Sequence, residues 1–594
     1  MTNIQELSKK IDQTQWDSTD KIIWEKLFPE SNDYKLIQEN TFELGLVLGG
    51  TVSAGAYTAG VLDYLIEALD SWELAKKQDC KAPDWKILIK AISGTSGGGV
   101  LATTLGKALS WEFPHVSSTT KVAQPLNPFY HVWVESLDIN DFLSTTDLEI
   151  KGGIKSLLNS DCRYKAGKYV ASFPPTPLVE KHRDYVTDPL PVFLTLTNLK
   201  GIPYKVDWGT NMSQSYVSHI DYARFAIFTK NGNSTLREDE FGVSFQPLNG
   251  YLKWDDVAKF ALGTSAFPVG LPLETLSRPI SHYLYRPIII SGDNTQINQT
   301  KIVPPNIDWE YLKNKDNNDI DLTYHFVAAD GGIINNEPIE LCRRELAGIL
   351  GRNPRAGNVA KRALILVDPF FDSPKLGGES FSNILSGFGD VFNGLKDQAR
   401  YDSQDLILAG DVNCYSRFMI TAKRGNILGG KAIATASLGA FGGFLCKEYR
   451  EHDYFLGRKN CKEFLSNVEN LWFPETNSLF AGWTNNNPDL ANKLKQRNSQ
   501  GEYCLPLIPL YGSALNEQTV PAFPKNAFVP DNTAFQSLLE ARVDRLLEKA
   551  KDELTSGFIS QTFVQIGLDF GGKSKLIEAI NIQIKKGLKN WDLI

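Results

Sequence analysis

One short stretch of the sequence places a nucleophilic side chain in a setting suited to catalysis. Residues Gly94–Gly98 read GTSGG and match G-x-S-x-G, a pattern that places a serine on a sharp turn between a strand and a helix. The flanks fit, because Trp85–Ile92 is apolar like a strand and Val100–Leu109 has helical apolar spacing. The glycines that let neighbouring backbone pass close to the serine are Gly94, Gly97 and Gly98. Ser96 is therefore predicted to be a nucleophile, although a glycine-rich turn without a catalytic role has the same letters.

A second turn of small residues, Gly49–Gly55, lies earlier in the chain. It joins the apolar stretch Phe42–Leu48 to Ala56–Ala68, which has helical spacing. Unpaired N–H groups and the dipole at the start of a helix favour negative charge. The turn is therefore predicted to form an oxyanion hole from the backbone amides of Gly49, Gly50, Thr51 and Val52.

The competing interpretation of this turn is a phosphate-binding loop. Gly50 and Gly55 have the spacing of such a loop, but Ala56 and Tyr57 stand where lysine and serine or threonine are required. The pattern G-x-G-x-x-G is also missing from this turn. Both observations disfavour a nucleotide site.

A third glycine turn carries a carboxylate. The sequence DGGIINNEP begins at Asp330, continues with Gly331 and Gly332, and follows the apolar stretch Tyr324–Ala329. A carboxylate at the end of a strand can accept the proton of a nearby serine. Asp330 is therefore predicted to be the general base, although an Asp-Gly-Gly turn is commonly only a turn.

The elements around these turns indicate an α/β protein. Two strand–turn–helix units in series favour parallel strands with crossover helices. Further strands are predicted at Pro191–Val206, Tyr222–Phe228, Tyr324–Ala329 and Arg362–Val367, the last of which closes the sheet. Helices are clearest at Ala541–Leu554 and Lys573–Trp591. The predicted organisation is an N-terminal helical extension (1–41), an α/β domain (42–372) with an insertion at about 110–185, and a mainly helical C-terminal region (373–594).

Taken together and in this order, the three turns resemble those of the patatin-like phospholipase family. LGLVLGG and GAYTAGVL look like its oxyanion segment, SGTSGGG like its nucleophile turn, and DGGIINNEP like its catalytic aspartate turn. Phe260–Pro272 is similar to its Ser-Ala-x-Pro segment, and the resemblance covers roughly Phe42 to Asp368. It implies a three-layer α/β fold with a mainly parallel central sheet. It also implies a Ser96–Asp330 dyad, without histidine, that cleaves acyl esters, chiefly of lipids.

The glycine turn departs from the family pattern. The family commonly has three glycines followed after one residue by arginine, whereas Thr51 and Val52 follow Gly50 here and Ala54 takes the arginine position. Backbone amides survive such changes, but a positive charge at the oxyanion site is lost. The loop nonetheless resembles a bacterial branch of the family with SAGAYTAG. A non-catalytic relative that binds lipid or a partner protein stays open as an alternative.

Two further residues, His452 and Ser265, have side chains that can take part in catalysis. His452 follows Ser96 and Asp330 in the chain order of an α/β-hydrolase triad, so a Ser-Asp-His enzyme is a second alternative. A histidine in such a charged helical stretch is more often at the surface or in hydrogen-bonded packing. Ser265 is predicted to be structural, because Ala266 and Pro268 follow where an elbow glycine and a helix are needed.

Composition narrows the possible partners and the compartment. The chain has 594 residues, with 62 Lys and Arg against 69 Asp and Glu, so a net charge of −7 argues against nucleic-acid binding. The seven cysteines form no C-x-x-C pair, which indicates neither zinc nor disulfides and fits the cytoplasm. No cofactor or metal is expected, since no His and carboxylate spacing typical of a catalytic metal site is found.

The C-terminal segment bears on membrane contact. The sequence has no uninterrupted apolar run of 18 residues, so a spanning segment is not expected. Leu576, Ile580, Ile584 and Leu588 form an apolar stripe among lysines, and such a helix can lie on an anionic lipid surface. Packing against the rest of the protein explains the same stripe and is preferred. The expected partner is a lipid ester substrate, with peripheral membrane contact as an option.

Overall fold

The computed structural model describes residues 37–117, 126–150, 152–175, 178–207, 212–230, 235–245, 248–290, 301–313, 321–349, 351, 353–370, 403–552 and 572–594. The helices predicted before residue 37 lie outside these ranges. Residues 301–313 include the strand β8 (Lys301–Val303) and a short 3-10 turn, Trp309–Leu312.

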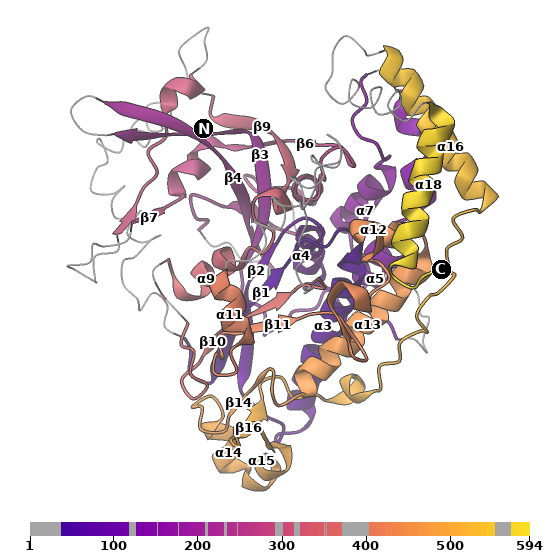
Figure 1. The fold of residues 1–594 in the computed structure, drawn as a ribbon. Helices are drawn as coiled ribbons and strands as arrows, with labels where there is room; N and C mark the ends of the chain where they lie inside the picture. The colour runs from indigo at the N-terminus through magenta and orange to yellow at the C-terminus, as the bar shows by residue number, and fades with distance from the viewer. Residues whose placement is uncertain are drawn as a thin grey trace.

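The protein is a mixed α/β protein built around a large, mainly parallel central sheet (Figure 1). Along the sheet the strand order is β11-β10-β1-β2-β3-β4-β5, with β9 and β6 joined to β3. The pairings β11–β10, β10–β1, β1–β2, β2–β3 and β4–β5 are parallel, while β3–β4, β3–β9 and β9–β6 are antiparallel. These strands are β1 (Thr41–Leu48), β2 (Lys86–Gly94), β3 (Leu190–Asp207), β4 (Ser213–Ile227), β5 (Phe241–Val243), β6 (Glu274–Pro279), β9 (Thr323–Asp330), β10 (Arg362–Val367) and β11 (Arg417–Ile420).

Both faces of the sheet are covered by helices. In a strand, successive side chains point to opposite faces. Val47 and Leu366 pack with α9 (Ile339–Ala347) on one face. Leu46 and Leu48 belong to the larger apolar core on the other face, which α3 (Gly55–Gln78) and α4 (Gly97–Ala108) help to form. Because strands buried on both faces must be apolar throughout, the short apolar runs of the sequence became the central strands.

The predicted elements near the three turns are confirmed, with shifted boundaries. The strand and helix on either side of Gly49–Gly55 are β1 and α3, and α3 continues ten residues beyond its predicted end at Ala68. The helix after Ser96 starts at Gly97, earlier than expected, because glycines can form the first turn where their close packing is needed. The insertion between α4 and β3 contains helices and loops, including α5 (Pro128–Tyr130), α6 (Ile139–Leu143) and α7 (Asp161–Ser172).

One correction concerns the end of the sheet. Arg362–Val367 was expected to close it, but β10 pairs with β11 on its outer side, so the sheet recruits a strand from beyond residue 372. The boundaries predicted for the three regions of the chain stay a prediction. In the described part, α13 (Lys447–Ser466) packs alongside α3, and β14 (Trp472–Pro474), β15 (Gln496–Arg497) and β16 (Tyr503–Pro506) form a small separate sheet.

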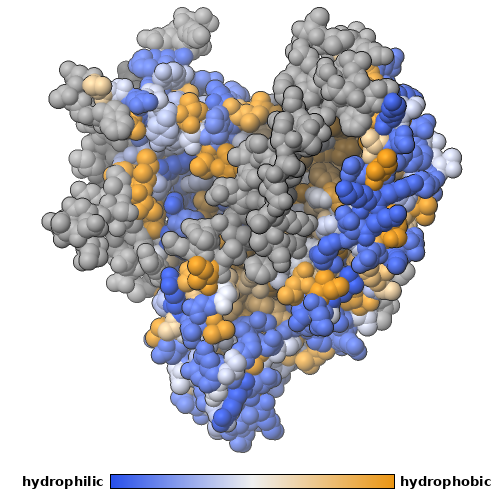
Figure 2. Space-filling model, viewed as in Figure 1, coloured by the Kyte–Doolittle hydropathy of each residue, from blue (hydrophilic) through white to orange (hydrophobic). Residues whose placement is uncertain are grey.

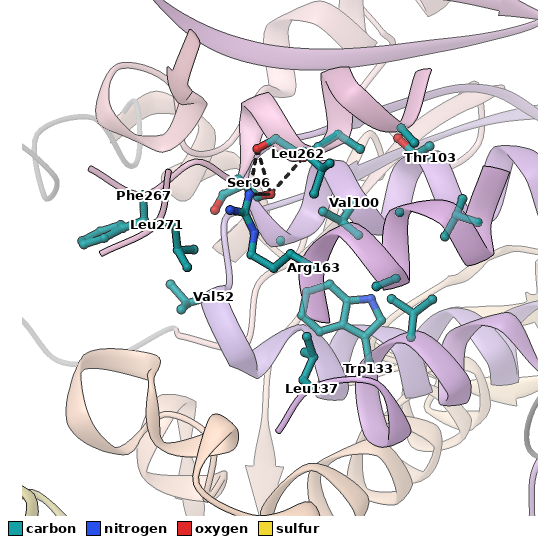
Figure 3. Close-up of a pocket in the computed structure, with 18 of the residues that line it drawn as sticks. Val52, Ser96, Val100, Thr103, Trp133, Leu137, Arg163, Leu262, Phe267 and Leu271 are labelled. Atoms are coloured by element: carbon teal, nitrogen blue, oxygen red, sulfur yellow. Dashed lines mark hydrogen bonds between the residues drawn. The ribbon is translucent and has the colours of Figure 1, made fainter. Parts of the chain in front are cut away.

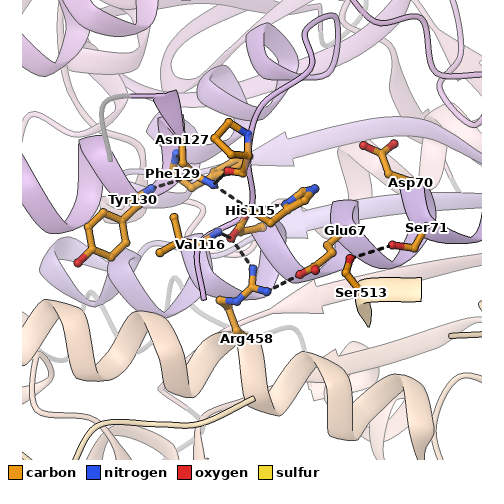
Figure 4. Close-up of polar contacts among 12 residues, drawn as sticks. Glu67, Asp70, Ser71, His115, Val116, Asn127, Phe129, Tyr130, Arg458 and Ser513 are labelled. Atoms are coloured by element: carbon orange, nitrogen blue, oxygen red, sulfur yellow. Dashed lines mark hydrogen bonds and ion pairs between the residues drawn. The ribbon is translucent and has the colours of Figure 1, made fainter. Parts of the chain in front are cut away.

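The helices α3 and α13 cross closely and share buried charges (Figure 4). Arg458 of α13 contacts both Asp63 and Glu67 of α3. Asp63 also accepts hydrogen bonds from Asn127 (2.9 Å) and from Tyr454 (2.7 Å). Buried charges are tolerated when they are paired and hydrogen-bonded in this way.

The C-terminal helix packs against the rest of the protein through one face. Leu576, Ile577 and Leu588 of α18 (Lys573–Lys589) are buried in an apolar cluster with α16 (Thr533–Asp552), and Ile580 and Ile584 pack against it. The face of α18 turned outward in Figure 2 is hydrophilic. The packing interpretation of the apolar stripe is therefore confirmed, and this stripe does not lie free for a lipid surface. Within the described ranges, no helix is long and apolar enough to cross a membrane.

Candidate active site

Ser96 occupies the turn between β2 and α4 in a strained backbone conformation. Its φ and ψ are 54° and −124°, a region that a residue with a side chain rarely adopts. The Ser96 N–H donates to Thr264 Oγ1 over 3.0 Å, at the end of α8 (Trp254–Thr264), and this bond holds the turn in place. A Cβ built on Gly98 would lie 2.2 Å from the carbonyl oxygen of Leu48, so only glycine permits this approach of α4 to β1. Such strain is typical of a nucleophile turn.

The register of the sheet brings Asp330 to Ser96. The end of β2 pairs in parallel with β3, with Gly94 opposite Leu194. The end of β9 pairs antiparallel with the same strand, with Asp330 opposite Leu196. The two strands therefore approach each other end to end along β3. Ser96 and Asp330, far apart in the chain, meet because β2 and β9 pair with neighbouring parts of the same long strand, β3.

The two predicted catalytic side chains are hydrogen-bonded directly. Ser96 Oγ donates to Asp330 Oδ2 over 2.7 Å, and both residues are buried. The second carboxylate oxygen, Asp330 Oδ1, accepts the N–H of Gly332 over 2.7 Å, which fixes the orientation of the carboxylate. A base within hydrogen-bond reach of a serine proton is the geometry that nucleophilic catalysis requires.

The glycine turn lies beside this pair. Two of the four amides predicted to form the oxyanion hole are hydrogen-bonded within the protein, and two have no backbone partner in the described ranges. The N–H groups of Gly49 and Gly50 donate to the carbonyl oxygens of Val367 and Asn336, both over 3.2 Å. Across the described ranges, no backbone partner is found for the N–H groups of Thr51 and Val52. Val52 has a φ of 48°, a left-handed conformation that is unusual for a β-branched residue. Of the four amides predicted for the oxyanion hole, those of Thr51 and Val52 stay available.

The aspartate turn packs directly against the other two turns. A Cβ built on Gly331 would lie 2.3 Å from Thr195 Oγ1, and Thr195 Oγ1 is 2.6 Å from Thr95 Oγ1 in the nucleophile turn. Asn336 receives the N–H of Gly50 and thereby ties the aspartate turn to the glycine turn. Sequence reasoning missed these roles of Thr195, Thr264 and Asn336, since neither a hydroxyl side chain nor a backbone carbonyl carries a periodic signal.

A cavity of about 770 Å³, including space open to solvent, reaches Ser96 and Asp330 (Figure 3). Its walls are mostly apolar side chains from the insertion and from α4 and α8. They include Val100, Val132, Trp133, Leu137, Phe142, Val170, Leu262 and Leu271. The volume falls within the range typical of pockets that bury a small organic ligand. The space-filling view shows hydrophobic residues gathered in a recess beside the C-terminal helices (Figure 2).

One charged side chain, Arg163 of α7, lies in this otherwise apolar wall. Its Nη2 donates to the carbonyl oxygen of Leu262 over 2.9 Å and to Ser265 Oγ over 3.1 Å. Burial lowers the pKa of the Arg163 guanidinium, and the charges of Glu274 and Asp330 are among those that oppose this shift. Sequence reasoning did not single out Arg163, because it lies in the insertion without a recognisable motif.

His452 and Ser265 have other contacts in the structure. His452 Nδ1 lies 2.7 Å from Asp453 Oδ1 in α13, and His452 is not among the residues that line the cavity. Ser265 Oγ donates to the carbonyl oxygen of Ala261 over 2.9 Å, as expected of a structural serine. Nowhere in the described ranges do three or more His, Cys, Asp or Glu side chains gather as metal ligands would.

Fold and site together define a mixed α/β protein with a serine–aspartate pair where β2 and β9 end, at the base of an apolar cavity. No protein-family model matches the chain. It is 30% identical over 602 residues to the uncharacterized protein y4iI of Sinorhizobium fredii (strain NBRC 101917 / NGR234), covering 93% of this chain and 82% of that protein. The chain therefore belongs to the same family as y4iI.

Among solved structures, the chain is similar to VipD from Legionella pneumophila at 10% identity. The match covers 93% of this chain and 91% of VipD with a TM-score of 0.16. A score of this size supports no argument about fold or function.

Proposed function

We propose that the protein is a serine acyl hydrolase that cleaves acyl esters of lipids with a Ser96–Asp330 dyad. The observation that carries this proposal is the 2.7 Å hydrogen bond from Ser96 Oγ to Asp330 Oδ2 beside an apolar cavity. The strained turn at Ser96 and the resemblance of three motifs to patatin-like phospholipases support it. The finer assignment, a patatin-like three-layer fold with a mainly helical C-terminal region, belongs to the same proposal, as does a cytoplasmic location.

In the proposed mechanism, Asp330 accepts the proton of Ser96 while Ser96 Oγ attacks the acyl carbonyl carbon. The tetrahedral intermediate collapses, and the alcohol leaves with the proton held by Asp330. Asp330 then takes a proton from a water molecule, which attacks the acyl-serine ester. The bond to Ser96 Oγ breaks, Oγ takes the proton back from Asp330, and the carboxylic acid leaves. Asp330 thus acts first as general base and then as general acid in each half of the reaction.

The negative charge on the tetrahedral intermediate needs donors that the ground state leaves free. The N–H groups of Thr51 and Val52 fit this need, and the first amides of α4 have no partner within their own helix. Amides aimed at a developing oxyanion are worth several kcal/mol in an enzyme site. No side-chain cation is needed at Ala54 for this contribution.

The test is hydrolysis of 4-nitrophenyl butyrate and of a lipid ester by the wild type and by Ser96→Ala. We expect the variant to lose activity by roughly three orders of magnitude or more, because the nucleophile is removed. Ser172→Ala, which changes an exposed serine at the end of α7, serves as the matched control. Equal turnover by a folded Ser96→Ala protein would exclude the serine mechanism.

One observation favours a second candidate, a non-catalytic lipid-binding protein. Two of the four amides predicted for the oxyanion hole, those of Gly49 and Gly50, are engaged in hydrogen bonds within the protein. A fluorophosphonate probe distinguishes the two candidates, because it labels only an activated serine. Labelling of the wild type and not of Ser96→Ala supports the enzyme, whereas lipid binding without labelling supports the second candidate.

A further inference from the structure

Arg163 is a buried positive charge held by neutral acceptors. Only 8% of the surface of Arg163 is exposed. Besides Leu262 O and Ser265 Oγ, its guanidinium contacts Ser160 Oγ, at 3.3 Å from Nη1. None of these acceptors is charged. A guanidinium removed from water without a counter-charge is costly, and proteins normally supply a carboxylate.

Five other buried arginines of the described ranges follow that rule. Each forms an ion pair: Arg183 with Asp70, Arg224 with Glu240 and Glu345, Arg278 with Asp221, Arg458 with Asp63 and Glu67, and Arg542 with Asp147. Among the residues that the structure describes, no carboxylate oxygen lies within 4.0 Å of a nitrogen of Arg163. Arg450 is also buried without a carboxylate, but it is not among the residues that line the cavity.

Arg163 lies in the cavity, where a bound ligand can supply a salt-bridge partner. Figure 3 shows its side chain beside Ser96 in the cavity. The neighbouring walls, including Val100, Trp133 and Leu262, are apolar, and the nearby carboxylates of Glu274 and Asp330 lie beyond salt-bridge distance of the Arg163 nitrogens. A planar guanidinium matches the oxygen pairs of phosphate and carboxylate groups. The cavity thus holds one positive charge without a salt-bridge partner, within a mostly apolar surface and close to the proposed nucleophile.

We propose that Arg163 binds an anionic oxygen group of the substrate, a phosphate or carboxylate, while the apolar walls hold the acyl chain. The substrate is then an acyl ester of an anionic amphiphile rather than of a neutral one. This inference deepens the proposed function and rests on Ser96 being the nucleophile. It also locates the positive charge of the site in the insertion, on α7, and not in the glycine turn.

Two lipids that differ only in the anionic group test this inference. They are oleoylglycerol phosphate and oleoylglycerol, each supplied in the same neutral detergent micelles. We expect the wild type to favour the phosphate lipid in kcat/KM by about tenfold or more. Arg163→Gln should lose this preference, slowing the phosphate lipid by about tenfold and the neutral lipid by no more than about threefold. Arg163→Lys, which keeps the charge but not the planar fork, should keep part of the preference.

The controls separate recognition from a structural role. Lys165→Gln removes the same charge from an exposed site on α7, where the side chain is 71% exposed, and should leave the preference unchanged. Arg163 also binds a carbonyl at the end of α8, so its loss can disturb Ser96 through Thr264. Equal slowing of both lipids by Arg163→Gln would show that Arg163 only supports the turn, and the inference would be wrong while the proposed function stood.

A binding arm decides the inference even if hydrolysis fails. Titration calorimetry compares both lipids on Ser96→Ala and on Ser96→Ala with Arg163→Gln. Preferential binding of the phosphate lipid that disappears with Arg163 supports the inference whatever the activity. Equal binding of the two lipids by Ser96→Ala overturns the inference. It is overturned in the same way if inorganic phosphate displaces both lipids equally. Failure of the wild type to cleave either lipid or 4-nitrophenyl butyrate would instead count against the proposed function.

Discussion

Among single residues, the direct hydrogen bond between Ser96 and Asp330 fits a catalytic dyad better than a triad. Ser96 Oγ reaches the carboxylate without an intervening group, whereas the imidazole of His452 is engaged by Asp453. In a Ser-His-Asp triad the imidazole lies between serine and carboxylate. The direct contact therefore favours Asp330 as the base, as the resemblance to patatin-like proteins implied.

The corresponding prediction compares Asp330→Asn with His452→Ala in ester hydrolysis. Asp330→Asn should lower kcat by roughly three orders of magnitude, because the amide keeps the shape of the carboxylate but cannot accept the proton. His452→Ala should retain most of the activity. Steady-state kinetics with 4-nitrophenyl butyrate measure both, with circular dichroism to verify folding. A folded His452→Ala protein as inactive as Asp330→Asn would require a triad.

Among elements, the crossing of α3 and α13 is a close helix contact that depends on glycine. A Cβ built on Gly60 would lie 1.9 Å from the carbonyl oxygen of Tyr454, and one built on Gly457 would lie 2.0 Å from that of Tyr57. Because both neighbours are backbone atoms, neither can move without shifting a helix. The glycine turn leads directly into α3, so this crossing also supports the proposed oxyanion site.

Gly457→Ala is therefore expected to lower the free energy of unfolding by roughly 1–3 kcal/mol, the usual cost of overpacking a core. Chemical denaturation measures the loss. The control is Gly410→Ala at the end of α11 (Ser403–Gly410), where an added Cβ meets nothing within 4 Å and the change should stay within about 1 kcal/mol. If the two variants were equally stable, the two helices would not be held as close as described.

The buried charges at the same crossing predict a dependence of stability on pH. Burial raises the pKa of Asp63, but the Arg458 guanidinium, His115 and Tyr454 outweigh burial and hold the pKa well below its usual value. A depressed carboxyl pKa adds stability above the unfolded pKa of about 3.9, and this stability is lost as the pH falls toward the folded pKa. Ionised Asp63 should therefore stabilise the protein at neutral pH and progressively less below about pH 4.

Asp63→Asn tests this dependence. We expect it to lower the free energy of unfolding by about 3 kcal/mol at neutral pH, because it leaves Arg458 with one of its two carboxylates. The difference from the wild type should shrink between about pH 5 and 3. Denaturant titrations across this range measure it, with Asp184→Asn, whose side chain is 74% exposed, as control. A difference that grows as the pH falls would contradict the assigned sign.

In the whole molecule, the C-terminal part of the chain supports the proposed site. Ser53 Oγ donates to the carbonyl oxygen of Ala440 over 2.5 Å and accepts the N–H of Gly443 over 2.9 Å. Phe444, from the same segment, lines the cavity. The helix α18 packs on this segment in turn, since a Cβ built on Gly587 would lie 2.2 Å from Leu438 Cδ2. Residues more than three hundred positions further along the chain thus hold the glycine turn in place.

Deletion of Lys573–Ile594 should therefore lower both the thermal stability and the hydrolysis of 4-nitrophenyl butyrate, because it uncovers an apolar cluster that α18 shares with α16. Differential scanning calorimetry and esterase assays measure the two effects. Membrane contact stays a prediction and is tested on the same protein by sedimentation with anionic vesicles. A truncated protein with wild-type stability and activity, but weaker vesicle binding, would show that α18 serves lipid contact rather than support.

The sequence by itself determined the local units of this protein. Strand β10 begins and ends at the predicted residues, Arg362 and Val367, and the three turns lie where expected. This succeeded because strand and turn signals depend on neighbouring residues: apolar runs form buried strands, and glycines permit strained turns. Ser96 and Asp330 are predicted to be catalytic for the same reason, because each lies on one of these turns.

Only the tertiary structure decided how these units meet. The register of β2 and β9 on β3 brings Ser96 to Asp330, and the recruitment of β11 extends the sheet beyond its predicted edge. The buried position of Arg163, the bond from Ser96 to Thr264 and the packing of α18 also depend on residues distant in sequence. Such contacts follow from the register and packing of whole elements, and no local pattern of residue types records which elements will become neighbours.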